Sequence, residues 1–343
     1  MLLFGCSVRL LRSAPDRALP RAATQATLRQ LALHGHPFVT VIHRLAICRC
    51  LLRGALLPFT LSHAAAVLPA VRGDGRGRGR LVTAVLVAGS FAPDMTYYAA
   101  SAVPGAMEFG NVTHSFPGVF TVDVAITWAT VALWLLLREP LVALLPRARR
   151  PRTATLLRCG APRARATPSL ALWWYVSAVL GGLTHVVWDA FTHHDRWGVR
   201  LFPVLDRQLG GRPLFSALQY GSSALAALLI TAFVVRALRR VPAAEPVGVP
   251  VLSVRDRWAA GVVLAACALI AATERASTWW AYWGSTASPW DLIPTLCFGA
   301  GAGLVLGVLL YAVGVRVWRP APPGVPGDPD AVSAGRGRSA GSR

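Results

Sequence analysis

Long apolar runs separated by short polar stretches dominate the pattern of hydrophobic positions along the chain. After Leu57 the apolar segments are Leu81–Ala92, Val119–Leu137, Leu170–Ala190, Leu214–Val235, Trp258–Thr273 and Leu292–Val317. A helix needs about 20 mostly apolar residues to cross a bilayer, and all but the first segment approach or reach that length. The pattern predicts an all-α, polytopic integral membrane helical bundle with about five to seven membrane helices.

Three regions of different composition divide the chain. Residues 1–56 hold eight arginines, one acid and no sustained apolar run. They resemble neither a signal peptide nor a membrane span. We expect an extension outside the working protein, or a mis-assigned start, with a basic lipid-binding arm as the alternative. Residues 57–318 form the predicted membrane domain, and the Pro/Gly/Ser-rich residues 319–343 are predicted to be a disordered tail.

Charge and cysteine content narrow the classes of partner. All 35 basic residues are arginines, and the net charge is +20. They lie in separate loops between apolar runs, so nucleic acid is not an expected partner. The six cysteines lack paired C-x-x-C spacing, which predicts neither a disulfide framework nor a zinc knuckle. Membrane lipid is the expected partner, and the sequence indicates no oligomeric state.

The distribution of arginine predicts how the chain is oriented. Residues 72–80, 138–166 and 236–257 are rich in arginine, which is typical of cytoplasmic connections. Residues 94–118 and the aromatic stretch at 277–290 have none, and we place them outside together with 191–213, although that connection has four. The exposed aromatic stretch predicts an interfacial belt, formed by Trp279, Trp280, Trp283 and Trp290.

Three metal-capable side chains stand four residues apart near the end of one apolar segment. They are His185, Asp189 and His193, within GGLTHVVWDAFTHHDRW. On a helix His185 and Asp189 share a face and can bind one ion, whereas His193 lies about 12 Å along the axis from His185. Either the helix frays after Ala190 and folds His193 back, or Asp189 bridges two ions. The alternative without metal is an interhelical hydrogen-bonded pair.

Three further candidates fall on the same predicted side of the membrane. Asp94 ends one apolar segment, His114 begins another, and His63 starts the short apolar stretch that runs inward from Thr60 to Val71. Taken singly, each histidine is also typical of a residue that only hydrogen-bonds between helices. Imidazole and carboxylate ligands suit zinc, with manganese or iron as alternatives. The sequence therefore predicts a divalent-metal site on the extracytoplasmic side of the cell membrane.

Four other polar residues near these candidates are given supporting roles. Asp123 either orients an imidazole or stabilises a helix N-terminus. His194 is expected to face solvent or to support a ligand. Arg196 and Arg200 are expected either to hold an anionic headgroup or to act as interfacial anchors.

Five motifs, in this order, resemble a known membrane-protein family. They are PFTLSHAAAVLP, GSFAPDMTYY, THSFPGVFTVD, LTHVVWDAFTH and LQYGSS, between Pro58 and Val235. The chain is similar in these motifs to the bacterial membrane proteins of the domain-of-unknown-function 4184 family. The order of histidines and aspartates is more distantly similar to that of membrane-bound metal-dependent hydrolases and of zinc-dependent phospholipase C.

The distant resemblance implies a ligand set and a reaction class. It assigns His63, Asp94, His114, His185, Asp189 and His193 as metal ligands. It implies a multi-metal site that activates water on a phosphoester or another lipid-linked ester. Phospholipase C is soluble and also uses its N-terminal amine as a ligand, so the number of ions stays open. The alternative class is a non-catalytic membrane protein, such as a metal transporter or an assembly factor, but transporters usually place ionisable residues near the midplane.

Overall fold

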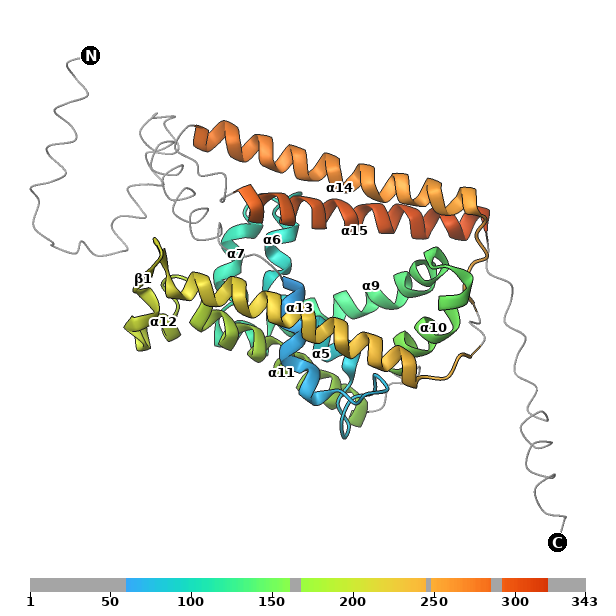
Figure 1. Cartoon of the computed structure of the whole chain (residues 1–343), viewed down its shortest axis with the longest axis horizontal. Helices are drawn as coiled ribbons and strands as arrows, with labels where there is room; N and C mark the ends of the chain where they lie inside the picture. The colour runs from blue at the N-terminus through green and yellow to red at the C-terminus, as the bar shows by residue number, and fades with distance from the viewer. Residues whose placement is uncertain (1–59, 161–167, 245–247, 285–291, 320–343) are drawn as a thin grey trace, which may run out of the picture. The chain divides into compact units, whose positions relative to one another are not determined.

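The computed structural model describes residues 60–160, 168–244, 248–284 and 292–319 (Figure 1). Residues 1–56, Trp290 and all of the tail but Arg319 lie outside them. Nearly all of the described chain is helical, and one small hairpin pairs β1 (Gln208–Leu209) with β2 (Arg212–Pro213). The all-α prediction is confirmed.

Five of the described helices are long and apolar enough to cross a membrane. They are α9 (Val122–Leu144), α11 (Pro168–Thr192), α13 (Leu214–Arg240), α14 (Val254–Trp283) and α15 (Leu292–Trp318). Each corresponds to one predicted apolar segment, so the number of such helices in the described part of the chain is at the lower end of the predicted range. The chain is therefore a multi-pass membrane-spanning protein.

Two segments that precede these helices are too short to cross a bilayer. The first is a run of single turns, η1 (Thr60–His63), α4 (Ala64–Val67) and η2 (Leu68–Ala70), and the second is α5 (Thr83–Gly89), followed by η3 (Ala92–Asp94). At about 1.5–2.0 Å per residue, neither spans the hydrocarbon core of about 30 Å. The first run packs on α13 and α11, and α5 packs on α11 and α9. Both segments therefore pack against the long helices, and neither spans a membrane by itself.

The predicted connections contain more helix than their polarity suggested. They contain α6 (Met95–Ala99), α7 (Ala106–Thr113), α8 (Phe116–Phe120), η4 (Arg147–Arg149), α10 (Arg150–Cys159), α12 (Trp197–Leu201) and η5 (Pro203–Asp206). Helix α9 also continues seven residues past the predicted end at Leu137. It does so because Glu139 is paired with Arg158 of α10 and the carbonyl of Pro140 accepts a hydrogen bond from Tyr311, at 2.8 Å.

Helices α14 and α15 run side by side (Figure 1) and pack closely through small residues. Glycines 299, 303 and 307 recur every four residues along α15. A Cβ added at Gly303 would meet the Cβ of Ala271 at 2.7 Å, so only glycine allows this approach. The spacing is that of a small-residue membrane-helix interface.

A second close approach joins α5 to α11, next to the position of His185 on α11. A Cβ added at Gly181 would lie 2.7 Å from the backbone nitrogen of Ser90, nearer than real Cβ atoms come to other heavy atoms. Around this contact the two helices bury an apolar cluster that includes Val85, Val179 and Val186. The absence of a side chain at Gly181 therefore sets how near the end of α5 comes to α11.

Candidate metal centre

The last turns of α11 bring His185 and Asp189 onto one face, as their spacing predicted. The Nε2 atom of His185 lies 3.3 Å from Oδ2 of Asp189. Helix α11 ends at Thr192, and the backbone N–H of His193 still donates to the carbonyl of Asp189 at 3.1 Å. The Nδ1 atom of His193 thus lies 3.3 Å from Oδ1 of Asp189, on the other side of the carboxylate.

Backbone carbonyls orient two of the imidazoles. The Nδ1 atom of His185 is 2.7 Å from the carbonyl oxygen of Ser90, at the end of α5. The Nδ1 atom of His114, which caps α7, is 2.9 Å from the carbonyl of Gly110. A carbonyl only accepts, so each Nδ1 carries a proton, and in the neutral ring each Nε2 keeps a free lone pair. Metal-ligating histidines are commonly held in this way.

The carboxylate of Asp94 is oriented from the first short segment. The hydroxyl of Thr60 donates to Oδ2 of Asp94 at 2.6 Å. Thr113 donates to the carbonyl of Pro93 at 2.8 Å and so ties α7 to the turn that carries Asp94. These two bonds leave Oδ1 of Asp94 directed at the two imidazoles.

Four ligand atoms from three parts of the chain face one another. Oδ1 of Asp94 lies 3.4 Å from Nε2 of His114 and 3.5 Å from Nε2 of His185. Oδ2 of Asp189 lies 3.5 Å from Nε2 of His114. All four atoms lie within 4.8 Å of one another, and all are buried without a hydrogen-bond partner among the described residues. The group could hold a metal ion.

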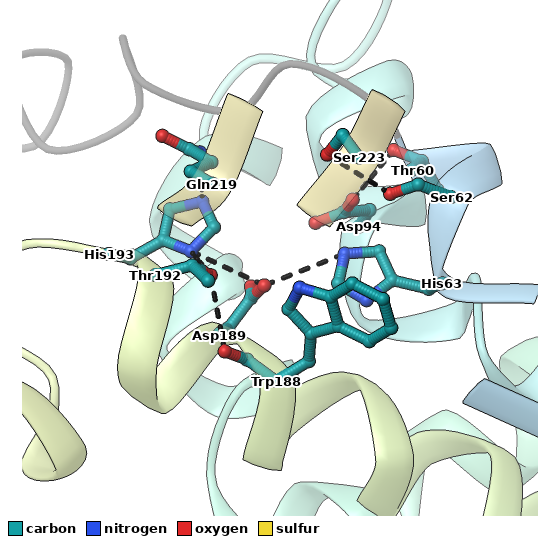
Figure 2. A pocket seen from close by; sticks show the side chains of 10 residues that line it. All are labelled: Thr60, Ser62, His63, Asp94, Trp188, Asp189, Thr192, His193, Gln219 and Ser223. Atoms are coloured by element: carbon teal, nitrogen blue, oxygen red, sulfur yellow. Dashed lines mark hydrogen bonds and ion pairs between the residues drawn. The ribbon is translucent and has the colours of Figure 1, made fainter. Parts of the chain in front are cut away.

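The second oxygen of Asp189 faces two more histidines (Figure 2). Oδ1 of Asp189 is 3.5 Å from Nε2 of His63, whose ring stacks on His185 with centroids 3.8 Å apart. On the opposite side, Nε2 of His193 lies 2.7 Å from the amide nitrogen of Gln219 on α13. These side chains line a cavity of about 10 Å³, which is close to the room that one water needs.

Burial and neighbouring charge shift the pKa values of His63 and Asp94 toward the forms that bind metal. The exposed fraction of each of the six predicted ligands is 7% or less. Burial, together with the nearby His185, lowers the pKa of His63 to about 3, so that its imidazole is neutral near pH 7. Burial alone would raise the pKa of Asp94, but the neighbouring His185 and His114 outweigh it and hold the pKa below its usual range.

Comparison with known proteins gives one match. Residues 57–313 match the model of the family described as Domain of unknown function (DUF4184). The chain belongs to this family. No curated protein and no solved structure matches the chain significantly.

The family assignment confirms the resemblance carried by the five motifs. The matched range contains all six predicted ligands, which the structure brings together at one place. The comparisons do not show the more distant similarity to metal-dependent hydrolases and phospholipase C. The family description names no activity.

Several polar groups at the centre were not singled out from the sequence. Thr60, Ser90 and Gln219 hold a carboxylate or an imidazole in place, two through side chains and one through its carbonyl. Gln219 and Thr60 lie within the quoted family motifs, which was the available signal. Any residue can supply a backbone carbonyl, so the role of Ser90 could not be predicted from its identity.

Asp123 and His194 do not play a part in orienting the imidazoles. Both carboxylate oxygens of Asp123 are buried without a hydrogen-bond partner among the described residues, whereas backbone carbonyls bond the Nδ1 atoms of His114 and His185. His194 is exposed, and its ring lies 5.9 Å from that of Phe215.

The two arginines beyond His193 differ in their surroundings. Arg196 interacts with the hydroxyl of the buried Tyr97, whose ring lies 5.4 Å from that of His114. Arg200 points away and bonds to Asp195, with Nη2 donating to the carbonyl at 2.9 Å. Arg196 thus acts on a side chain that packs beside His114, whereas the bond of Arg200 is to Asp195.

Proposed function

We propose that the chain is a membrane-embedded, metal-dependent hydrolase that acts on a phosphoester or another lipid-linked ester. The observation that carries the proposal is the group of four buried, unpartnered ligand atoms of Asp94, His114, His185 and Asp189. In the form that binds metal, two carboxylates and two neutral imidazoles would carry a charge of −2 in a buried place, which is costly unless a cation balances it. A divalent ion supplies that charge.

The spacing of these atoms favours zinc. Ligands about 2.0–2.1 Å from a tetrahedral ion lie about 3.3–3.4 Å from one another. Of the six separations, the four between a histidine nitrogen and a carboxylate oxygen are 3.3, 3.4, 3.5 and 3.5 Å, and the other two are no more than 4.8 Å. Manganese and iron usually take more oxygen ligands than this group offers.

We further propose that all six residues are ligands and that Asp189 bridges two ions. His63 and His193 flank the oxygen of Asp189 that the four-atom group leaves free. Beside them is the water-sized cavity, which gives a second ion a position open to water. Zinc sites that catalyse reactions keep such a position, whereas structural zinc sites are closed.

The chain's own residues have distinct roles in this proposal. Bound ions would lower the pKa of a water and polarise the scissile group. Gln219 holds His193 through Nε2, which leaves Nδ1 directed at Asp189 as the ligand atom. Arg196 is placed to hold the anionic group of a substrate, because it reaches the buried Tyr97 beside His114.

We place the centre on the extracytoplasmic side. The metal centre lies at the C-terminal end of α11, and the arginines of residues 72–80 lie near its N-terminal end. Arginine-rich ends face the cytoplasm. Cysteines introduced at the exposed Gly105 and Arg149 test this orientation with an impermeant maleimide on intact cells. Labelling at residue 149 and not at 105 would reverse it.

A second candidate is a non-catalytic membrane protein in which the ion is structural. Four protein ligands around one ion, without an open position, are typical of structural zinc. The four-atom group alone would fit that description. A transport role is disfavoured, because side chains packed along α11 towards its arginine-rich end, such as Val85 and Val179, are apolar.

Metal content and hydrolysis, measured on the same purified protein, test the two candidates. We expect the protein to retain zinc, His185→Ala/Asp189→Ala to lose it, and the zinc-loaded protein to hydrolyse an aryl phosphodiester or a short-chain phospholipid. Arg196→Gln should raise KM by about 10-fold or more, the value of one charge-assisted hydrogen bond, without changing zinc content. Arg200→Gln, the matched control, should change neither.

The outcomes separate the metal site from the reaction. Zinc retained by the double variant would refute the ligand assignment. Zinc bound by the wild type, but with no hydrolysis of phosphodiester, phosphomonoester or carboxylic ester substrates, would refute the hydrolase and favour the structural ion.

A further inference from the structure

A cavity of about 690 Å³ lies at the N-terminal end of α11, away from the metal centre. Its walls come from the basic turn at residues 72–80, the start of α5, the end of α10 and the first turns of α11. Trp173, which lines it, precedes His185 by twelve residues, or about 18 Å along the helix. The cavity is therefore separate from the metal centre.

Among the described residues, the charged ones that line the cavity are four arginines. Two of the four have a carboxylate partner, because Arg76 is paired with Asp74 and Arg158 with Glu139, which also contacts Arg138. The other two, Arg72 and Arg80, are exposed and form no ion pair within the described residues. The cavity thus keeps two uncompensated positive charges.

Two uncharged groups in the wall add hydrogen-bond donors. The indole Nε1 of Trp173 and the hydroxyl of Thr83 are buried, and neither has a hydrogen-bond partner among the described residues. The first turn of α11, with Ser169, also lines the cavity, and a long helix carries partial positive charge at this end. Donors and positive charge from several elements favour an anion with many acceptor oxygens, as in a phosphate group.

The rest of the wall is apolar and lies at the end of a membrane helix. Leu81, Val82 and the ring of Trp173 face the cavity beside the arginines. Free phosphate gains nothing from contact with an apolar surface, whereas a phospholipid has acyl chains next to its phosphate that can pack against it. We propose that the cavity binds the phosphate headgroup of an anionic phospholipid, with Arg72 and Arg80 as its charged contacts.

Lipid binding by the purified full-length protein tests the proposal. The probe is fluorescent phosphatidylglycerol, titrated in detergent and compared with phosphatidylcholine carrying the same label. Arg72→Gln/Arg80→Gln should weaken phosphatidylglycerol binding by about 30-fold, as expected for two arginines worth about 1 kcal/mol each at a membrane surface. Trp173→Phe, which keeps the ring and removes the donor, should weaken it about 5-fold.

The control has the same change in net charge outside the cavity. Arg78→Gln/Arg147→Gln removes two exposed arginines that do not line it, and should leave binding unchanged. Zinc content and the thermal midpoint of each variant verify folding. An equal loss in the control, or no preference for phosphatidylglycerol in the wild type, would overturn the proposal. Displacement of the lipid by millimolar inorganic phosphate would also overturn it, in favour of a free-phosphate site.

Discussion

The two ends of α11 are both polar, but they are built in opposite ways. At the C-terminal end His185 and Asp189 are buried, exposed by no more than 1%, and their ligand atoms converge with those of other elements. At the N-terminal end Arg72 and Arg80 are exposed around a large cavity. The C-terminal end holds its ligand atoms in fixed positions, whereas the N-terminal end presents exposed positive charge.

The difference follows from what each kind of group costs to bury. Buried carboxylates are tolerated only where a partner compensates them, so the metal end must hold every atom in place through bonds such as those of Ser90 and Thr60. Exposed guanidinium groups keep their hydration and need no fixed partner. We therefore expect the metal end to respond to small backbone shifts and the arginine end to respond to changes in charge.

The largest expected effect tests the dependence on position. Gly181→Ala places a Cβ 2.7 Å from the backbone nitrogen of Ser90, so α5 and α11 must separate. Overpacking of this kind costs about 1–3 kcal/mol of stability. Separation also breaks the bond from His185 to the carbonyl of Ser90, and losing such support weakens metal binding by up to about 100-fold. Zinc competition with a chelator and thermal unfolding in detergent measure the two effects.

A second glycine provides the control. A Cβ at Gly221, on α13, would meet nothing within 4 Å. Gly221→Ala should therefore leave both zinc affinity and the thermal midpoint unchanged or slightly improved. If Gly181→Ala binds zinc as tightly as Gly221→Ala, then the approach of α5 to α11 does not set the geometry of the centre.

Sequence pattern predicted the long helices well and their continuations poorly. Hydropathy registers the lipid-facing part of α9 but not its last turns, where Glu139 and Pro140 continue the helix because α10 and α15 bond to them. The fold beyond the apolar runs depends on such tertiary partners, which no local pattern contains.

The candidate site shows the same limit. The spacing of His185 and Asp189 is visible because both lie on one helix. Their convergence with Asp94 and His114 was inferred only from a shared side of the membrane and from the family resemblance. Of the two roles offered for Asp123, carbonyls take that of orienting the imidazoles, and any residue can supply a carbonyl. Asp123 lies in the first turn of α9, as the other role requires.

An intermediate effect is expected from the hydroxyl that orients Asp94. Thr60→Val keeps the shape of the side chain but removes the 2.6 Å hydrogen bond to Oδ2 of Asp94. Loss of such a bond to a metal-ligating carboxylate costs about 10-fold in affinity. Thr231→Val, on the exposed side of α13, removes only a bond to the carbonyl of Ala227 and should have no effect on zinc. Equal chelator competition curves for the two variants would show that Thr60 is not needed.

The smallest effect on stability is expected at the arginine end. There, a single change should act in opposite directions on stability and on lipid binding. Glu139 pairs with Arg158 at 2.8 Å, with side chains 21% and 33% exposed, and ion pairs of this kind contribute about 0.2–1 kcal/mol. Glu139→Gln should lower the thermal midpoint slightly and leave zinc affinity unchanged. It should also strengthen phosphatidylglycerol binding several-fold, because Arg158 lines the cavity and loses its anion. Weaker lipid binding in this variant would mean that the placement of Arg158 by Glu139, and not the total charge, governs the cavity.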